Sequence, residues 1–219
     1  MLTKAQIKRR LKAVVARFRR IGLHNTDFTI ISNNCWGGCV YDQYGLQYRT
    51  PTIGLWMGAE DYIKFISDLD RYLNSELVQI SCEEFHLYSV VKARHERGKY
   101  DKPLSEMVFG RLDDVDIFFL HYSTFEEAKQ KWDRRKKRID RKNIIYKFND
   151  QNCFEKRFFE DFSRIDGKKL FFTCDEEYKG KENAVVYPEA TPAAEGGGVV
   201  DDTDLSRLPF DLKEFLNSI

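Results

Sequence analysis

The sequence predicts an α/β protein with a Rossmann-like layered fold around a largely parallel, or mixed, sheet. Short apolar runs rich in β-branched and aromatic residues alternate along the chain with segments whose apolar residues recur at helical spacing. Residues 115–120 form a nearly continuous apolar run, which is typical of a strand buried on both faces. Hydrophobic residues make up 42% of the 219 residues and aromatic residues 14%, which is enough for a sizeable core.

The first predicted elements are a basic helix over residues 3–20 and a strand over residues 27–32. The helix carries an apolar stripe at spacings of three and four, formed by Ile7, Leu11, Val14, Val15 and Phe18. We expect this stripe to dock on the core while the cationic residues face solvent. The same pattern also suits a helix that lies on an anionic membrane surface. After the strand, a turn-forming loop is expected.

The middle of the chain is predicted to continue with helices and strands. Residues 60–73 keep helical spacing, and residues 85–91 are expected to form a strand. The apolar run at 115–120 predicts a further strand. Ser123 and Glu126 have the spacing of a capping box, so we expect a helix to follow them.

The last part of the chain is predicted to add three strands, one helix and a tail. The strands are expected at 143–148, 169–173 and 184–187, and the helix at 155–165. Residues 189–204 are rich in Ala, Pro, Gly and Asp, which is typical of a flexible linker, and a short helix is expected at 211–217. We therefore predict one α/β domain over residues 1–188, including the basic helix, and a flexible linker with a short C-terminal helix over residues 189–219.

Charge and cysteine content exclude several classes of protein. Lys plus Arg number 36 and Asp plus Glu 35, and the net charge of +1 argues against a nucleic-acid-binding protein. Five cysteines at irregular spacings favour free thiols in a reducing compartment, and the polar N-terminus is unlike a signal peptide. No apolar run approaches the length of a membrane span. We expect a cytoplasmic location, with peripheral contact to membrane-bound polysaccharide machinery at the inner membrane face as an option.

The segment from Ser32 to Gly38 is the strongest candidate for a binding site. It combines two amides, a thiol, an indole and two glycines directly after a predicted strand: Ser32, Asn33, Asn34, Cys35, Trp36, Gly37 and Gly38. Consecutive glycines let backbone N–H groups approach an anion, and Asn side chains can stabilise an oxyanion or bind sugar hydroxyls. Trp36 could stack on a sugar ring. The structural alternative is a tight turn in which Trp36 and Cys35 fill gaps in the core.

Cys35 and His121 are the predicted catalytic pair. A nucleophilic cysteine needs a base that holds it as thiolate, and His121 follows a predicted strand just as Cys35 does. Because ligands of open α/β sheets bind beyond the carboxyl ends of the strands, we expect both residues at one edge of the sheet. The alternatives are a buried structural thiol and a core histidine. Cys35 and Cys39 have no second Cys or His pair at ligand spacing, so no metal site is expected.

Further ligand contacts are predicted from a cationic segment and from a loop. Residues 131–142 contain eight Lys and Arg residues, most of which are expected to be solvated. Arg135 and Arg138 are the predicted phosphate ligands, since a guanidinium can donate two parallel hydrogen bonds to a phosphate. Arg49 and Thr52 lie in a proline-containing loop and are predicted to contact an anionic or hydroxylated ligand.

Three blocks of the sequence carry a family resemblance. They are residues 30–38 (IISNNCWGG), 50–55 (TPTIGL) and 119–122 (FLHY), the last followed by Glu126-Glu127-Ala128, Lys131-Trp132, Arg135 and Arg138-Ile139. In order and spacing, over about residues 25–175, they resemble a bacterial family of proteins of unknown function that are often labelled exopolysaccharide or capsule biosynthesis proteins. The resemblance implies an accessory enzyme of extracellular polysaccharide synthesis and identifies no reaction.

The predicted function is that of a cytosolic transferase that acts on a sugar or an activated sugar precursor. Acyl transfer is slightly favoured over glycosyl or phosphoryl transfer, with an acyl-CoA or a nucleotide sugar as donor. The sequence has no P-loop, GxGxxG or GxSxG motif, which removes the commonest signals of kinases, dehydrogenases and hydrolases. The alternative is a non-catalytic carbohydrate- or nucleotide-binding module that scaffolds a membrane-associated polysaccharide complex.

Overall fold

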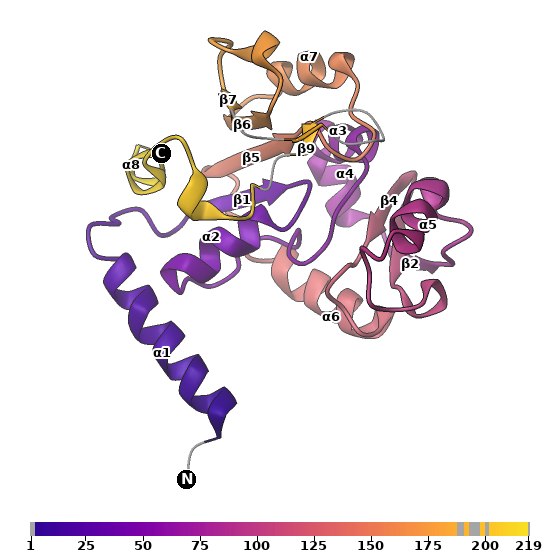
Figure 1. The fold of residues 1–219 in the computed structure, drawn as a ribbon, viewed down its shortest axis with the longest axis horizontal. Helices are drawn as coiled ribbons and strands as arrows, with labels where there is room; N and C mark the ends of the chain where they lie inside the picture. Colours follow the sequence, from indigo (N-terminus) through magenta and orange to yellow (C-terminus); the bar gives the residue numbers. More distant parts are fainter. Residues whose placement is uncertain (1–2, 188–190, 193–197, 200–201, 219) are drawn as a thin grey trace.

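A parallel sheet and a smaller antiparallel sheet organise the computed structural model, which describes residues 3–187, 191–192, 198–199 and 202–218 (Figure 1). The parallel sheet has the order β1-β5-β6-β7, with bounds Thr29–Ser32, Ile144–Asn149, Lys168–Thr173 and Ala184–Val186. The antiparallel sheet has the order β2-β3-β4, with bounds Leu77–Ile80, Phe109–Leu112 and Val115–Phe118. A two-stranded pair joins β8 (Thr191–Pro192) to β9 (Gly198–Val199). The predicted layered α/β fold is confirmed.

Eight α-helices surround the sheets in the part of the chain that the structure describes. They are α1 (Lys4–Arg19), α2 (Trp36–Tyr44), α3 (Ala59–Ser67), α4 (Leu69–Asn74), α5 (Tyr88–Glu96), α6 (Phe125–Lys136), α7 (Lys156–Arg164) and α8 (Leu212–Asn217). Short 3₁₀ helices lie at Leu104–Glu106, Glu176–Tyr178 and Leu205–Arg207. The long connection from β1 to β5 therefore holds the whole antiparallel sheet together with α2 to α6.

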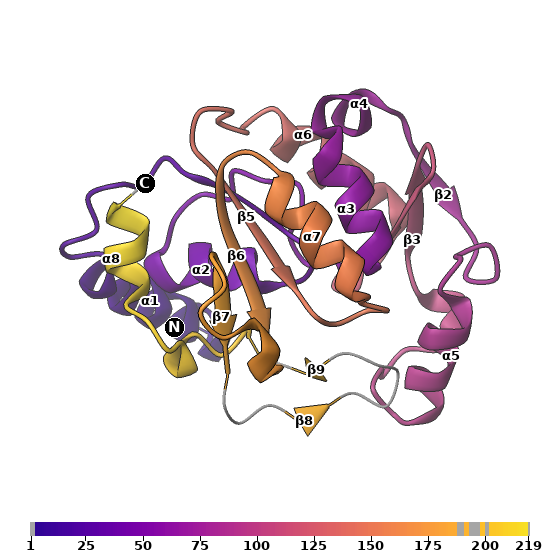
Figure 2. The same cartoon turned by 90° about the horizontal axis from the view of Figure 1, so that it is seen from above.

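Each face of the parallel sheet has its own apolar core, because alternate side chains of a strand point to opposite faces. On one face, visible in Figure 2, α3 and α7 pack with α6 on a cluster that includes Ile31, Phe148 and Phe171. On the other face, α2 and α8 pack on a cluster that includes Ile30, Ile145 and Phe172. In β5, position 147 has the parity of Ile145, so its side chain belongs to the α2 face.

Three predicted elements differ from the structure. The strand expected at 85–91 is wrong, because this segment is a turn that leads into α5 at Tyr88. The helix expected at 60–73 is interrupted at Asp68, whose side chain accepts a hydrogen bond from the Arg71 N–H and caps α4. Helix α6 is capped by Thr124 rather than Ser123, with the Glu127 N–H donating to the Thr124 hydroxyl at 3.1 Å.

The apolar stripe of α1 is exposed. Figure 1 shows most of this helix extending beyond the body of the protein, and its stripe residues include Leu11 at 61% and Phe18 at 68% exposure. The helix contacts α2 instead through Ala16, which is 4% exposed and lies on the opposite face. The expectation that the stripe docks on the core is therefore wrong.

The tail after the parallel sheet is described in part. Residues 188–190, 193–197 and 200–201 lie outside the described residues, so the flexibility of the expected linker stays a prediction. Helix α8 forms within the range where a short helix was expected. Within the described ranges, no helix has the length and apolarity that crossing a membrane requires.

Candidate functional site at the carboxyl edge of the parallel sheet

The segment that follows β1 is half loop and half helix, and not the turn-forming loop expected throughout. Helix α2 begins at Trp36, so both glycines lie in its first turn. A Cβ at Gly37 would meet Ile30 Cγ2 at 3.0 Å, which shows that this glycine permits close packing of α2 on β1. The Trp36 N–H donates to Asn34 Oδ1 at 3.1 Å, and the Gly37 N–H to the Ser32 hydroxyl at 3.5 Å. The Gly37 N–H, one of the two backbone amides predicted to bind an oxyanion, thus already has a partner.

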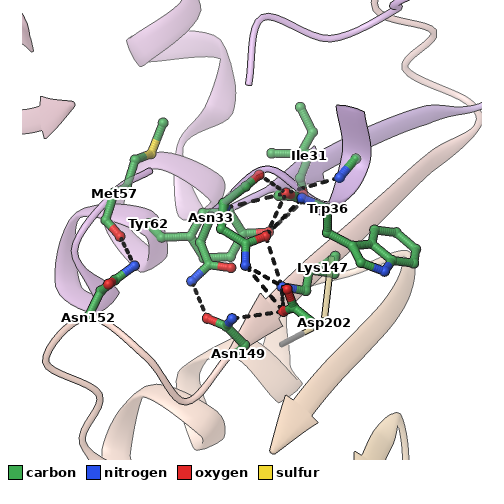
Figure 3. A network of polar contacts seen from close by, with 12 residues as sticks. Ile31, Asn33, Trp36, Met57, Tyr62, Lys147, Asn149, Asn152 and Asp202 are labelled. Carbon is green, nitrogen blue, oxygen red and sulfur yellow. Dashed lines mark hydrogen bonds and ion pairs between the residues drawn. The ribbon is translucent and has the colours of Figure 1, made fainter. Parts of the chain in front are cut away.

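A buried lysine lies at the centre of the site (Figure 3). Lys147 comes from β5, and its ammonium forms an ion pair with Asp202 in which the two side chains are 0% and 1% exposed. Lys147 also donates to Asn34 Oδ1 at 3.0 Å. The Asp202 carboxylate accepts further hydrogen bonds from Nδ2 of Asn34 at 2.9 Å and from Nδ2 of Asn149 at 2.8 Å. A cation, an anion and two amides therefore meet where β1 and β5 end.

The environment of Lys147 is unusual for a lysine. Burial lowers the pKa of Lys147, while the Asp202 carboxylate opposes this effect by stabilising the ammonium form. Buried ion pairs gain little stability over an apolar packing of the same volume, because both charges lose their hydration. Buried ionisable groups with a perturbed pKa are concentrated at functional sites.

Asn33 has one buried polar atom without a partner among the residues that the structure describes. Its N–H donates to the Lys147 carbonyl at 3.3 Å, its carbonyl accepts from the Met57 N–H at 3.0 Å, and its Nδ2 donates to Asn149 Oδ1 at 2.7 Å. Its Oδ1 atom is buried and has no hydrogen-bond partner among the described residues. Buried acceptors are nearly always paired, so this oxygen is a candidate acceptor for a hydroxyl or amine of a ligand.

The polar edge extends beyond β5 to β6. Asp150, directly after β5, accepts from the Thr173 hydroxyl at 2.6 Å and from the Cys174 N–H at 3.3 Å. The next turn holds Asn152 at φ 60° and Cys153 at φ 64°, in the left-handed region that non-glycine residues rarely adopt. Such backbone strain is concentrated at functional sites.

Cys35 is held as a neutral thiol. Burial, with smaller contributions from Cys39 and the Asp202 carboxylate, raises the pKa of the Cys35 thiol to about 12. Its Sγ atom lies 4.0 Å from the Leu55 carbonyl oxygen. A nucleophilic cysteine needs an environment that lowers its pKa, so these electrostatics disfavour the predicted nucleophilic role.

His121 is exposed, and the expectation that it follows a strand of the parallel sheet is wrong. The strand before it, β4, belongs to the antiparallel sheet. The His121 N–H donates to the Gly54 carbonyl at 3.0 Å, next to the residue that Cys35 contacts. Both members of the predicted catalytic pair therefore contact the backbone of residues 54–55. In the described part of the chain, no hydrogen bond joins their two side chains.

Several predicted ligand contacts have internal partners instead. Trp36 is fully buried and packs edge-on against Phe172 with ring centroids 5.5 Å apart, which fits the structural alternative better than sugar stacking. Thr52 is buried and accepts from the Ser32 N–H at 3.2 Å. Arg49 pairs with Asp27 at 3.2 Å, and Arg138 donates to the Tyr48 carbonyl at 3.2 Å. A Cβ at Gly38 would lie 3.5 Å from Ile53 Cγ2, so this glycine faces a side chain of the protein.

Arg135 is nearly buried and contacts two tyrosines. It is 6% exposed, donates to the Tyr122 hydroxyl at 2.6 Å, and lies over the Tyr48 ring at 4.9 Å. Among the described residues no carboxylate forms an ion pair with it. This is an environment in which a guanidinium can bind a phosphate.

Lys147, Asn149 and Asp202 are the functional candidates that sequence reasoning missed. A signal for Lys147 was present, since a lysine within an otherwise apolar predicted strand is rarely buried without a partner. Asp202 gave no signal, because it lies in the segment expected to be a linker. In the described ranges, no group of three or more His, Cys, Asp and Glu residues could hold a metal ion.

Two comparisons with known proteins bear on the family. A family model described as Domain of unknown function (DUF1919) matches residues 6–192. An uncharacterized protein of Haemophilus influenzae is 23% identical over 171 residues, which cover 78% of this chain and 73% of that protein. The family match includes Asn33, Lys147 and Asn149, whereas Asp202 lies beyond it.

Proposed function

The chain belongs to the family described as Domain of unknown function (DUF1919), and from its site we propose that it is a transferase of bacterial exopolysaccharide or capsule synthesis. It acts on a sugar or an activated sugar precursor at the carboxyl edge of β1 and β5. Three sequence blocks that resemble proteins labelled in this way support the biological setting. Support for the chemistry comes from the site alone.

The buried pair of Lys147 and Asp202 is the observation that carries this proposal. It lies near the carboxyl ends of β1 and β5, and α/β proteins bind ligands beyond this end of their parallel strands. The unpartnered Oδ1 of Asn33 suits a sugar hydroxyl, which would donate to it. The ammonium of Lys147 suits an anionic group or a developing oxyanion, because its charge is poorly screened inside the protein.

Acyl transfer is the reaction that we favour. The sugar hydroxyl oxygen forms a bond to the acyl carbon, the carbon–sulfur bond of an acyl-CoA breaks, and the hydroxyl proton passes through the Lys147–Asp202 pair to the thiolate that leaves. The raised pKa of Cys35 favours this direct transfer over a covalent thioester on the protein. Arg135 is the candidate ligand for a phosphate of the donor.

A non-catalytic binding module is the second candidate. Like direct acyl transfer, it needs no activated nucleophile on the protein, in agreement with the raised pKa of the Cys35 thiol and with the lack of a hydrogen bond between Cys35 and His121 among the described residues. The polar edge would then bind a carbohydrate or nucleotide without turnover. The two functions differ in one observable, which is product formation.

The test is a ligand screen followed by a turnover assay on the full chain. We expect at least one ligand among acyl-CoAs, nucleotide sugars and sugar phosphates to raise the unfolding temperature, since a ligand at about 100 times its Kd adds about 2.7 kcal/mol. Mass spectrometry of the ligand mixtures then detects the transferred group. Binding without product selects the second candidate.

Matched variants assign the result to the site. The double variant Lys147→Met with Asp202→Asn removes both buried charges. We expect it to fold, and we expect the ligand no longer to raise its unfolding temperature. Lys156→Met, at a 68% exposed lysine, is the control and should keep this shift. Full activity in Cys35→Ala and His121→Ala would remove these two residues from the mechanism. A shift that survives the double variant contradicts the proposed site.

A further inference from the structure

Exposed apolar side chains of the described residues are concentrated on α1 and the residue that follows its last turn. In the part of the chain that the structure describes, seven large hydrophobic side chains are exposed, and six of them lie here: Ile7 at 46%, Leu11 at 61%, Val14 at 50%, Val15 at 45%, Phe18 at 68% and Ile21 at 68%. The seventh is Val78 in β2, at 44%. Contiguous exposed apolar surface of this kind marks an interaction site.

The six residues form one continuous stripe. At about 100° per residue, the five that lie on α1 fall within an arc of about 100° on the helix surface, and Ile21 follows in the turn after the helix. The opposite side of α1 contacts the body of the protein, through Ala16 and through an ion pair between Lys12 and Asp42 at 2.7 Å. The helix is therefore fixed to α2 by one side while its stripe points outward. We call these six residues the α1 stripe.

Charge around the α1 stripe is of one sign. Residues 1–26 contain eight Lys and Arg residues and no Asp or Glu, while the whole chain has a net charge of only +1. On the helical wheel, Arg10 and Arg17 fall along one border of the stripe and Arg19 beyond the other, and all three are exposed. The remainder of the chain is thus net negative, and positive charge is concentrated beside the apolar surface.

We propose that α1 is an in-plane anchor that binds an anionic phospholipid surface. Its stripe would enter the boundary between headgroups and acyl chains, and the bordering arginines would contact lipid phosphates. A second copy of the chain is a poorer occupant. Pairing two stripes would bring the three bordering arginines of each copy close together, and these six like charges would repel one another. This anchor is independent of the proposed reaction and would place the protein at the membrane where lipid-linked sugars are found.

Vesicle co-sedimentation of the full chain tests this proposal without any substrate. We expect the wild-type protein to sediment with phosphatidylcholine vesicles that contain phosphatidylglycerol, and to remain in solution with phosphatidylcholine alone. High salt should weaken the binding, because it screens the attraction between lysine or arginine and the lipid. Failure to bind anionic vesicles at low salt overturns the proposal, whatever else the helix contacts.

Two matched pairs of variants separate the stripe from the charge. Phe18→Ser should weaken vesicle partitioning by about tenfold or more, while Val78→Ser, at the one exposed large hydrophobic residue elsewhere in the described chain, should not. Arg10→Gln with Arg17→Gln should weaken it by about 30-fold, and Lys156→Gln with Lys179→Gln, which removes the same charge elsewhere, should have little effect.

Light scattering without vesicles identifies the competing occupant. A wild-type dimer that Phe18→Ser converts to a monomer, together with no vesicle binding, would assign the stripe to a second copy and overturn the proposal. Circular dichroism of each variant checks that α1 and the body remain folded. Equal loss of binding in the variants and in their controls would also overturn it, since the effect would then not come from the stripe.

Discussion

His86 lies between two aspartates in a cluster outside the candidate site. Its Nε2 atom pairs with Asp61 Oδ2 at 2.9 Å and its Nδ1 atom with Asp116 Oδ2 at 2.8 Å. Arg111 holds the other side of Asp116, with Nε at 2.5 Å from Oδ1. Hydrogen bonds to Asp116 and then to Asp61 raise the pKa of His86 to about 10. The imidazolium thus joins α3 to the antiparallel sheet, through Asp61 on α3 and Asp116 on β4.

The first prediction is a pH-dependent contribution of His86 to stability. The folded pKa of about 10 lies above the unfolded value of 6.5, so the contribution is complete below about pH 6.5 and is lost as the pH rises through about 10. We expect His86→Gln to lower the free energy of unfolding by about 1–3 kcal/mol near pH 6, because Asp61 loses its cation. Urea unfolding from pH 6 to 10 measures this difference, which should shrink at high pH. His95→Gln on α5 is the control, and a difference constant with pH would refute the ion pairing.

Helix α2 depends on a glycine for its contact with β1, and its two glycines differ in this respect. Gly37→Ala would place a methyl group 3.0 Å from Ile30 Cγ2, and we expect it to cost about 1–3 kcal/mol. Gly38→Ala would meet Ile53 at an ordinary 3.5 Å, and we expect it to stabilise the protein by up to about 1 kcal/mol, since Ala favours helix over Gly. Urea unfolding of both variants provides the measurement. Equal effects would show that α2 does not pack as closely as described.

Most strands and helices could be predicted because their apolar periodicity reflects burial directly. The strands β1, β5 and β6 lie within two residues of their predicted bounds. Helix α2 could not be predicted, because consecutive glycines disfavour a helix in isolation and only the packing against Ile30 compensates. Asn33 and Asn34 could be singled out from local composition. The partner of Lys147 could not, because Asp202 is 55 residues away in the sequence and the contact is purely tertiary.

At the scale of the whole molecule, helix α8 is hydrogen-bonded to the segment between α1 and β1. Asn217 accepts a hydrogen bond from the His24 N–H at 2.7 Å and donates to the Gly22 carbonyl at 2.8 Å. Leu212 and Leu216 of α8 are buried in the core on the α2 face of the sheet. The family match ends at residue 192. Helix α8 and Asp202 therefore both lie beyond the matched region.

The last prediction is that the matched region depends on α8 for its stability. Leu216 is 0% exposed, and we expect Leu216→Ala to lower the free energy of unfolding by about 2–5 kcal/mol through lost burial and a residual cavity. Val78→Ala, at a 44% exposed valine, is the control and should cost less than about 1 kcal/mol. Urea unfolding followed by tryptophan fluorescence is suitable, because Trp36 lies in the same core as Leu216. If the two variants unfold alike, α8 contributes no more than an exposed side chain does, and the α2 face of the sheet is stable without it.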